Sequence, residues 1–331
     1  MTGAPAGEST RAIVIAAHGR PDVLQMDTVA LAPPGPGELR IRQTAIGVNY
    51  HDVYVRSGSY QTLSLPGVPG LEGAGVVEQL GEGVTDFAIG DRIAYTDNKY
   101  GGYSAARNIP AAQAVPVPDG VDDVTAAAAF LKGMTAVALA DSVHPLSAGM
   151  TILVHAAAGG VGRLLTQLAK ARGCRVIGTV GSSSKVESAR TAGCDEIVLY
   201  REEDVAARVA QLTAGRGVEV VFDAVGADTF EGSLGALGVR GHIVLYGQAS
   251  GPVPPFELSR LGAKSASVTR PFLWAYVSTP AQLRSVAAAL FAAIADGELK
   301  VEMGGTYPLA DAAGAHRDLE ARRAGPFVLI P

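Results

Sequence analysis

The clearest hydrophobic pattern in the chain lies between residues 151 and 170. An apolar run from Ile152 to Val154 ends in small residues. Beyond them, apolar residues recur with the i, i+3, i+4, i+7 spacing of one helix face, at Val161, Leu164, Leu165 and Leu168. The pattern predicts a buried strand, a tight turn and a helix, in that order.

The predicted turn is rich in glycine, with Gly159, Gly160 and Gly162 in the order Ala-Ala-Ala-Gly-Gly-Val-Gly. Glycine lets the backbone approach a ligand closely, and a helix N-terminus offers unpaired N–H groups and a partial positive charge to a pyrophosphate. We therefore expect a dinucleotide to bind here. The order departs from the strict G-x-G-x-x-G, so a simple turn is the alternative.

A second strand, Cys174 to Val180, completes a β-α-β unit of about thirty residues. A site for NAD would place Asp or Glu at the end of this strand, where it binds the ribose 2′-OH. The chain instead continues with Gly181, Ser182 and two more serines before Lys185. Hydroxyls and a cation would accept a 2′-phosphate, which favours NADP(H). The alternative is that the serines cap the next helix and Lys185 is merely solvated.

The alternation of strand and helix repeats after residue 195, as a parallel sheet wound on both faces requires. The predicted strands are 196–200, 218–225, 242–247 and 265–269, and the predicted helices are 205–213 and 229–237. The central part of the chain is therefore predicted to be an α/β nucleotide-binding domain.

The N-terminal part has a different pattern, in which short β-like runs are separated by Gly and Pro. These runs are 11–16, 38–45, 74–80, 92–95 and 112–117, and they predict a small, mostly β domain.

Residues 124–140 are predicted to form a helix that leads to the nucleotide-binding domain. At the C-terminus, helices are predicted at 281–295 and 310–322 and a strand at 326–331. We expect this tail to return to the first domain, because two helices and one strand cannot form a core of their own.

Length and composition limit the classes of protein to which the chain can belong. The chain of 331 residues is long enough for two domains, and its 48% hydrophobic and 18% charged residues indicate a well-filled core. We find no apolar run that would cross a bilayer and no secretory signal, so a soluble cytoplasmic protein is expected. A net charge of −5 without a basic cluster argues against nucleic-acid binding. The two cysteines and six histidines are scattered, so no metal site is predicted.

Seven segments together resemble the NADPH:quinone oxidoreductases, the ζ-crystallin-like family of zinc-independent medium-chain dehydrogenases/reductases. They span nearly the whole chain and are residues 47–58, 70–77, 130–135, 155–162, 178–181, 200–204 and 223–226. The resemblance implies a GroES-like catalytic domain, predicted at 1–125 and 271–331, and a Rossmann NADP-binding domain at 126–270. It also implies a cofactor that lies in the cleft, and a homodimer joined through the nucleotide domains.

The resemblance bears on metal use. Zinc alcohol dehydrogenases of the same superfamily carry Cys and His where this chain has Asn49 and Leu71. An amide and an isobutyl group do not replace a thiolate and an imidazole as zinc ligands. Without a Lewis acid, the enzyme should prefer acceptors that take hydride readily, such as quinones or conjugated enones.

The resemblance also implies site residues. Asn49 and Tyr54 would be catalytic, as donors to a carbonyl oxygen that gains charge as hydride arrives. The alternative is that Tyr54 only packs and Asn49 only holds a turn. Asp52 is expected to be structural. His51 stands where the family usually has an apolar residue, so it is interpreted either as a proton donor or as a surface histidine.

For the cofactor, the family places the segment of Lys132 and Thr135 near the nucleotide, although Lys132 alone could be a solvated helix charge. Lys185, Tyr200 and Arg322 would clamp the 2′-phosphate, with Arg323 as the alternative to Arg322. Residues at the ends of later strands would border the nicotinamide ribose. The predicted cofactor-binding set is Asn49, Thr135, Gly159, Gly160, Val161, Gly162, Gly181, Ser182, Lys185, Tyr200, Val225, Tyr246, Gly247 and Arg322.

The function predicted from the sequence is NADPH-dependent quinone reduction without a metal. Reduction of the double bond of an enone or alkenal is the alternative, since it would use the same residues. A different class of function is an NADPH-holding structural protein of the crystallin type, or an RNA-binding protein. The absence of a basic stripe argues against RNA. The presence of Asn49 and Tyr54 argues against a purely structural role.

Overall fold

A computed structural model describes residues 8–321, 323 and 325–331. The chain divides into two compact units, which are described separately below. Unit 1 contains the chain up to Leu131, Thr279–Ala295 and Val301–Pro331, and unit 2 contains Lys132–Ser278 and Asp296–Lys300. The units differ from the predicted domains in three segments: residues 126–131 belong to unit 1, and residues 271–278 and 296–300 belong to unit 2.

Unit 2 is built on a six-stranded parallel sheet in the order β10-β9-β8-β11-β12-β13. Its strands are β8 (Thr151–Val154), β9 (Arg175–Val180), β10 (Glu196–Leu199), β11 (Val218–Asp223), β12 (Leu237–Leu245) and β13 (Ser267–Thr269). Numbered along the chain, this order is 3-2-1-4-5-6, which is that of the Rossmann fold. The α/β prediction for this part of the chain is confirmed.

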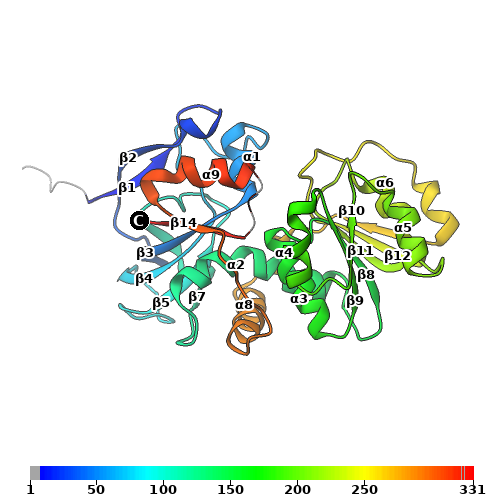
Figure 1. Ribbon diagram of the computed structural model, residues 1–331. Coiled ribbons are helices and arrows are strands. Elements are labelled where there is room, and N and C mark those ends of the chain that lie inside the picture. Colours follow the sequence, from blue (N-terminus) through cyan, green and yellow to red (C-terminus); the bar gives the residue numbers. More distant parts are fainter. Residues whose placement is uncertain (1–7, 322, 324) are drawn as a thin grey trace, which may run out of the picture. The chain divides into compact units, whose positions relative to one another are not determined.

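Helices cover both faces of this sheet. Figure 1 shows α3 (Gly160–Ala171) and α4 (Val186–Thr191) on one face and α5 (Val205–Leu212) and α6 (Phe230–Ala236) on the other. The apolar positions of α3, Leu164, Leu165 and Leu168, are buried, so the predicted helix face is the face that packs. A short helix, α7 (Leu273–Tyr276), follows β13.

Unit 1 contains a mostly antiparallel sheet in the order β14-β15-β3-β4-β5-β7, with β6 paired to β3 beside it, and a separate hairpin of β1 and β2. Its strands are β1 (Ser9–Val14), β2 (Gln25–Ala30), β3 (Glu38–Val48), β4 (Glu72–Leu80), β5 (Arg92–Thr96), β6 (Ala106–Pro110), β7 (Ala114–Pro116), β14 (Gly305–Pro308) and β15 (Phe327–Ile330). This unit corresponds to the predicted β domain, with three strands, β2, β6 and β14, that the hydrophobic pattern did not predict.

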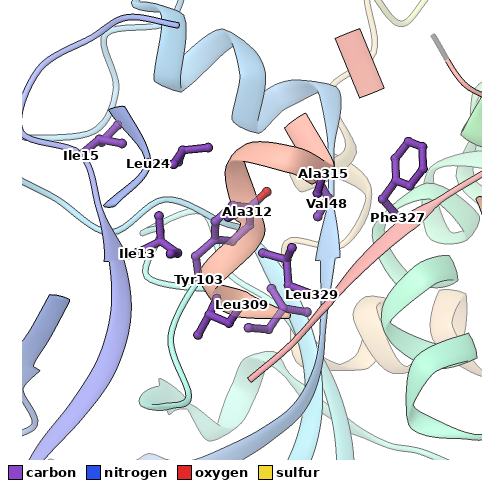
Figure 2. Packing of buried hydrophobic residues seen from close by; sticks show 11 residues of the cluster. Ile13, Ile15, Leu24, Val48, Tyr103, Leu309, Ala312, Ala315, Phe327 and Leu329 are labelled. Atoms are coloured by element: carbon purple, nitrogen blue, oxygen red, sulfur yellow. The ribbon is translucent and has the colours of Figure 1, made fainter. Parts of the chain in front are cut away.

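The core of unit 1 joins the two ends of the chain. Figure 2 shows Ile13 and Ile15 from the N-terminal part packed with Phe327 and Leu329 of β15, all fully buried. The strand β15 also pairs antiparallel with β3, from Phe327 opposite Val48. The C-terminal residues therefore complete the core that the N-terminal residues begin.

Unit 1 also has three helices: α1 (Tyr50–Ser57), α8 (Pro280–Ala295) and α9 (Ala312–Glu320). The pattern predicted α8 and α9 to within a few residues but did not predict α1. The helix α2 (Asp123–Ala138) contains the boundary between the two units at Leu131.

One helix bears on the prediction that no apolar run of the chain crosses a bilayer. The helix α2 continues as a π-helical turn to Val143, and the run Asp123–Val143 is long and apolar enough to cross a membrane by length and composition. Its mean hydropathy is 1.3, and 67% of the apolar window is buried inside the fold. A buried core helix passes the same test, so this run is weak support for a membrane span.

Candidate functional site

The glycine-rich turn of unit 2 connects β8 to α3. The helix begins at Gly160, and a Cβ on Gly162 would overlap the carbonyl oxygen of Ala156. A Cβ on Gly160 would lie 2.9 Å from Cδ of Lys132. Gly162 is therefore required for the close approach of the helix to the backbone of the turn. The first N–H groups of a twelve-residue helix are presented there. The structure places Gly159, Gly160, Val161 and Gly162 together here.

A buried polar network begins at His155, the residue that follows β8 and precedes this turn. Ser233 donates to Asp223 Oδ2 at 2.7 Å, so its oxygen is left to accept from His155 Nε2, which is 3.0 Å away. The other ring nitrogen, Nδ1, then accepts from Thr179 Oγ1 at 2.8 Å. Burial lowers the pKa of His155, which keeps the ring neutral, as this arrangement requires. The network ties β8, β9, β11 and α6 together.

The end of β9 is where a 2′-phosphate was predicted to bind. A Cβ on Gly181 would lie 3.0 Å from the hydroxyl of Tyr200, so these two predicted residues are neighbours. Ser182 Oγ is 2.9 Å from Ser184 Oγ, and Lys185 ends the same short 3-10 turn. Arg201, which sequence reasoning missed, lies over the ring of Tyr200 with its Cζ 5.9 Å from the centroid.

Of the two C-terminal arginines predicted as alternatives for the 2′-phosphate, only Arg323 lies within the described residues. Arg322 lies outside the described residues, so its predicted role stays a prediction. Arg323 is exposed and donates to Asp318 Oδ2 at 2.9 Å within unit 1.

Tyr246 has a buried side-chain hydroxyl at the C-terminal edge of the sheet of unit 2. Its hydroxyl is buried, and among the described residues nothing accepts or donates a hydrogen bond to it. Burial raises the pKa of this phenol, so it remains protonated. A Cβ on the adjacent Gly247 would lie 2.5 Å from the carbonyl oxygen of Ala224, which brings the backbone close at this strand end. Because a buried unpaired hydroxyl costs about 1–3 kcal/mol, the position fits a bound polar ligand.

The other predicted cofactor residues in unit 2 lie on its sheet edge and on α2. Val225 is buried just beyond the end of β11, and its N–H donates to Asp223 Oδ1 at 2.8 Å. Thr135 is half-buried on α2.

In unit 1, Asn49 is held by a carboxylate that the sequence analysis did not single out. Its Nδ2 donates to Glu72 Oε1 at 2.7 Å, and Glu72 Oε2 accepts from the N–H of Leu131 at 2.6 Å. Glu72 is fully buried, and a Cβ on Gly47 would overlap its Oε1. The amide of Asn49 is thereby fixed in one orientation, with its second N–H not used by Glu72. Glu72 stands in the segment 70–77 that carried the family resemblance.

Buried hydrogen bonds link the helix α1 to Tyr103 and to α9. Asp52 Oδ2 accepts from the N–H of Asn49 at 2.8 Å and from the hydroxyl of Tyr103 at 3.0 Å. The oxygen of Tyr103 is in turn 3.0 Å from His316 Nε2 on α9. Burial lowers the pKa of His316 to about 3 and raises that of Tyr103. The neutral imidazole therefore donates to the tyrosine, and the tyrosine donates to the carboxylate.

A second link between α1 and α9 is an ion pair. The two Nη atoms of Arg56 contact the two carboxylate oxygens of Glu320 at 2.6 and 3.0 Å, and the Arg56 side chain is almost fully buried. Such a two-point contact fixes both distance and orientation. The C-terminal end of α1 is thus also fixed to α9.

The outer side of α1 carries a cluster of rings, here called the aromatic cluster: Tyr50, His51, Tyr54, Tyr60 and Tyr100. Ring centroids are 4.9 Å apart for Tyr54 and Tyr60 and 5.3 Å apart for His51 and Tyr60. His51 Nε2 is 3.1 Å from the hydroxyl of Tyr100, which also contacts the hydroxyl of Thr62. Burial lowers the pKa of His51 to about 4. His51 is therefore neutral near pH 7 and half-buried, which excludes a freely solvated histidine.

Within the described ranges, no group of three or more His, Cys, Asp or Glu residues could hold a metal ion. Leu71 is buried in an apolar group with Val55 and Tyr100.

Comparison with known proteins gives consistent matches along the chain. The family described as "Alcohol dehydrogenase GroES-like domain" matches residues 35–119, and "Zinc-binding dehydrogenase" matches residues 160–291. A quinone oxidoreductase of Pseudomonas aeruginosa is 46% identical over 96% of this chain and 99% of its own length. A 2-haloacrylate reductase of Burkholderia sp. is 41% identical over 97% of this chain and 98% of its own length.

A solved structure gives the same result. The crystal structure of Escherichia coli quinone oxidoreductase complexed with NADPH matches with a TM-score of 0.94 and 42% identity, covering 97% of this chain and all of that one. Given relatives of more than 40% identity along nearly its whole length, the chain belongs to the quinone oxidoreductase family of the medium-chain dehydrogenases/reductases.

Proposed function

We propose that the protein is an NADPH-dependent quinone oxidoreductase that transfers hydride from NADPH to a quinone without a metal ion. The observation that carries this proposal is the full-length match to quinone oxidoreductases, one of which was solved with NADPH. A steady-state assay of NADPH oxidation against a panel of quinones tests it, with NADH as the alternative donor.

Unit 2 has the features that NADPH needs. The N-terminus of α3 and the glycines before it would hold the pyrophosphate. Lys185 and Tyr200, with Arg322, would hold the 2′-phosphate, and Arg201 beside Tyr200 adds a second guanidinium near that position. The buried hydroxyl of Tyr246 and the backbone at Val225 and Gly247 would border the nicotinamide end. When bound, NADPH supplies the hydride.

The residues of unit 1 would bind the acceptor. Asn49 still has one N–H beyond the one given to Glu72, and Tyr54 carries a phenolic hydroxyl within the helix α1 that begins just after Asn49. Both are neutral donors, suited to an acceptor oxygen that gains negative charge. The fixed amide of Asn49 would need little rearrangement when that charge develops.

The proposal includes independence from zinc. Where zinc dehydrogenases have Cys and His, this chain has an amide that is engaged with Glu72 and a buried leucine side chain. Neither side chain offers the nitrogen or sulfur lone pair that zinc prefers. By family resemblance we further expect a soluble cytoplasmic homodimer that forms through unit 2 and binds no nucleic acid.

Reduction of an activated double bond is the second candidate. The 41% identical relative named as a 2-haloacrylate reductase favours it, because that name describes reduction of a carbon–carbon double bond next to a carboxyl group. The same assay, extended to enones and 2-haloacrylates, ranks the two candidates by kcat/KM.

A further inference from the structure

Three polar groups of unit 1 form a hydrogen-bonded chain that the proposed hydride transfer does not use. His51 Nε2, the hydroxyl of Tyr100 and the hydroxyl of Thr62 contact one another in that order. Tyr100 has a φ of +64°, a left-handed conformation that is costly for a residue with a large side chain. The fold therefore maintains the position of this ring against a local backbone preference.

These three groups have one more hydrogen-bond donor than the two hydrogen bonds between them use. A neutral imidazole has one N–H, and each hydroxyl has one O–H, so the three groups supply three donors. Burial keeps His51 neutral, as described above. Two hydrogen bonds join the three groups and use two of the donors. One of the three donors must therefore point away from the other two groups.

The location of His51 indicates where the spare donor points. His51 and Tyr54 are three residues apart on α1, so they lie on the same face of the helix, and the rings of both pack against Tyr60. Thr62, the last of the three hydrogen-bonded groups, is exposed on the loop after Tyr60. If Thr62 donates to Tyr100 and Tyr100 donates to His51 Nε2, the proton of His51 is on Nδ1. Among the described residues, Nδ1 makes no hydrogen bond, and it belongs to a ring that packs against Tyr60, as the ring of Tyr54 does.

We propose that His51 Nδ1 donates a hydrogen bond to the second carbonyl oxygen of a para-quinone whose first carbonyl is bound by Asn49 and Tyr54. His51 then determines specificity, because an enone of the same ring size has only one carbonyl oxygen. This inference rests on the proposed function, in which Asn49 and Tyr54 bind the acceptor. The reduction itself balances as usual: the quinone gains a hydride and one solvent proton, and NADPH loses the hydride.

The test compares two acceptors that differ by one carbonyl, 1,4-benzoquinone and 2-cyclohexenone. His51→Leu removes the donor and should lower kcat/KM for benzoquinone about five- to tenfold, the size of one neutral hydrogen bond, while kcat/KM for cyclohexenone stays within about twofold. His51→Gln keeps a neutral N–H and should restore part of the benzoquinone activity. Tyr100→Phe leaves the ring but removes the group that fixes the Nδ1–H tautomer, so its loss should be intermediate and selective for benzoquinone.

A matched control is Tyr95→Phe, which removes another buried tyrosine hydroxyl of unit 1, the one that donates to Gln43 Oε1 at 2.7 Å. It should leave the ratio of the two kcat/KM values unchanged. Equal losses on both acceptors for His51→Leu, or no loss on either, would overturn the inference while leaving the proposed function intact. A wild-type enzyme that reduces cyclohexenone but no quinone would overturn both.

Discussion

At the scale of single residues, the proposed chemistry depends on neutral donors rather than on a strong acid. Asn49 is fixed by Glu72, and His51 is kept neutral by burial. A quinone accepts hydride without strong acid catalysis, so these donors should contribute moderately to the rate. Most of the rate would come from holding the donor and acceptor carbons close together.

Tyr54→Phe should therefore lower kcat with a quinone by about tenfold or less and leave the affinity for NADPH unchanged. A donor to a localised oxyanion can be worth on the order of 3 kcal/mol, but the charge on a reduced quinone is spread over the ring. With an enone the charge gathers on one oxygen, so the loss should be larger. Steady-state kinetics on both acceptors measure this. Abolished quinone reduction would make Tyr54 an essential acid, and unchanged rates on both would place it outside the site.

Lys185→Ala should weaken NADPH binding by about tenfold or more and leave NADH binding nearly unchanged. A charge-assisted contact to phosphate is worth roughly 1.5–3 kcal/mol, and only NADPH carries the 2′-phosphate. Titration of the protein's fluorescence with each cofactor measures both affinities. Lys300→Ala, which removes an exposed lysine elsewhere in unit 2, is the control. Equal losses for the two cofactors would remove Lys185 from the clamp.

At the scale of elements, regular patterns were predicted well and tertiary contacts were not. The sheet of unit 2 repeats a strand and a helix, so its strands follow from local periodicity. The helix α1 has no long apolar face and owes its place to Tyr103, Arg56 and their partners on α9. For the same reason the sequence did not reveal Glu72 or the link between His51 and Tyr100. Each of these contacts joins residues that lie far apart in the chain, and no local spacing records them.

The anchoring of α1 by α9 makes stability sensitive to acid. His316 is fully buried with a pKa of about 3, compared with 6.5 when unfolded, so the unfolded state takes up its proton first as pH falls. Stability is then complete above about pH 6.5 and is lost progressively toward pH 3. Between pH 7.5 and 5, this group alone should cost about 2 kcal/mol of unfolding free energy. Urea unfolding at the two pH values measures the difference.

The control for this prediction is His316→Gln, which keeps an N–H for Tyr103 but cannot titrate. Its unfolding free energy should depend less on pH, with the remaining slope due to other groups such as the buried His155. An equal slope in the variant and the wild type would show that His316 does not cause the acid sensitivity.

At the scale of the whole molecule, one of the two family descriptions that match this chain, "Zinc-binding dehydrogenase", mentions zinc, and the other does not. We predict that the purified protein contains no stoichiometric zinc and that its activity survives exhaustive chelation. The physical reason is the donor set: Asn49 is engaged with Glu72, and Leu71 is buried among apolar side chains. Hard and borderline cations bind oxygen, nitrogen or thiolate ligands arranged around one point, and a single amide beside a carboxylate gives only a weak site. Elemental analysis and assays after chelation test this directly. One zinc per chain, with activity lost on its removal and regained on its return, would show that the metal-free mechanism is wrong.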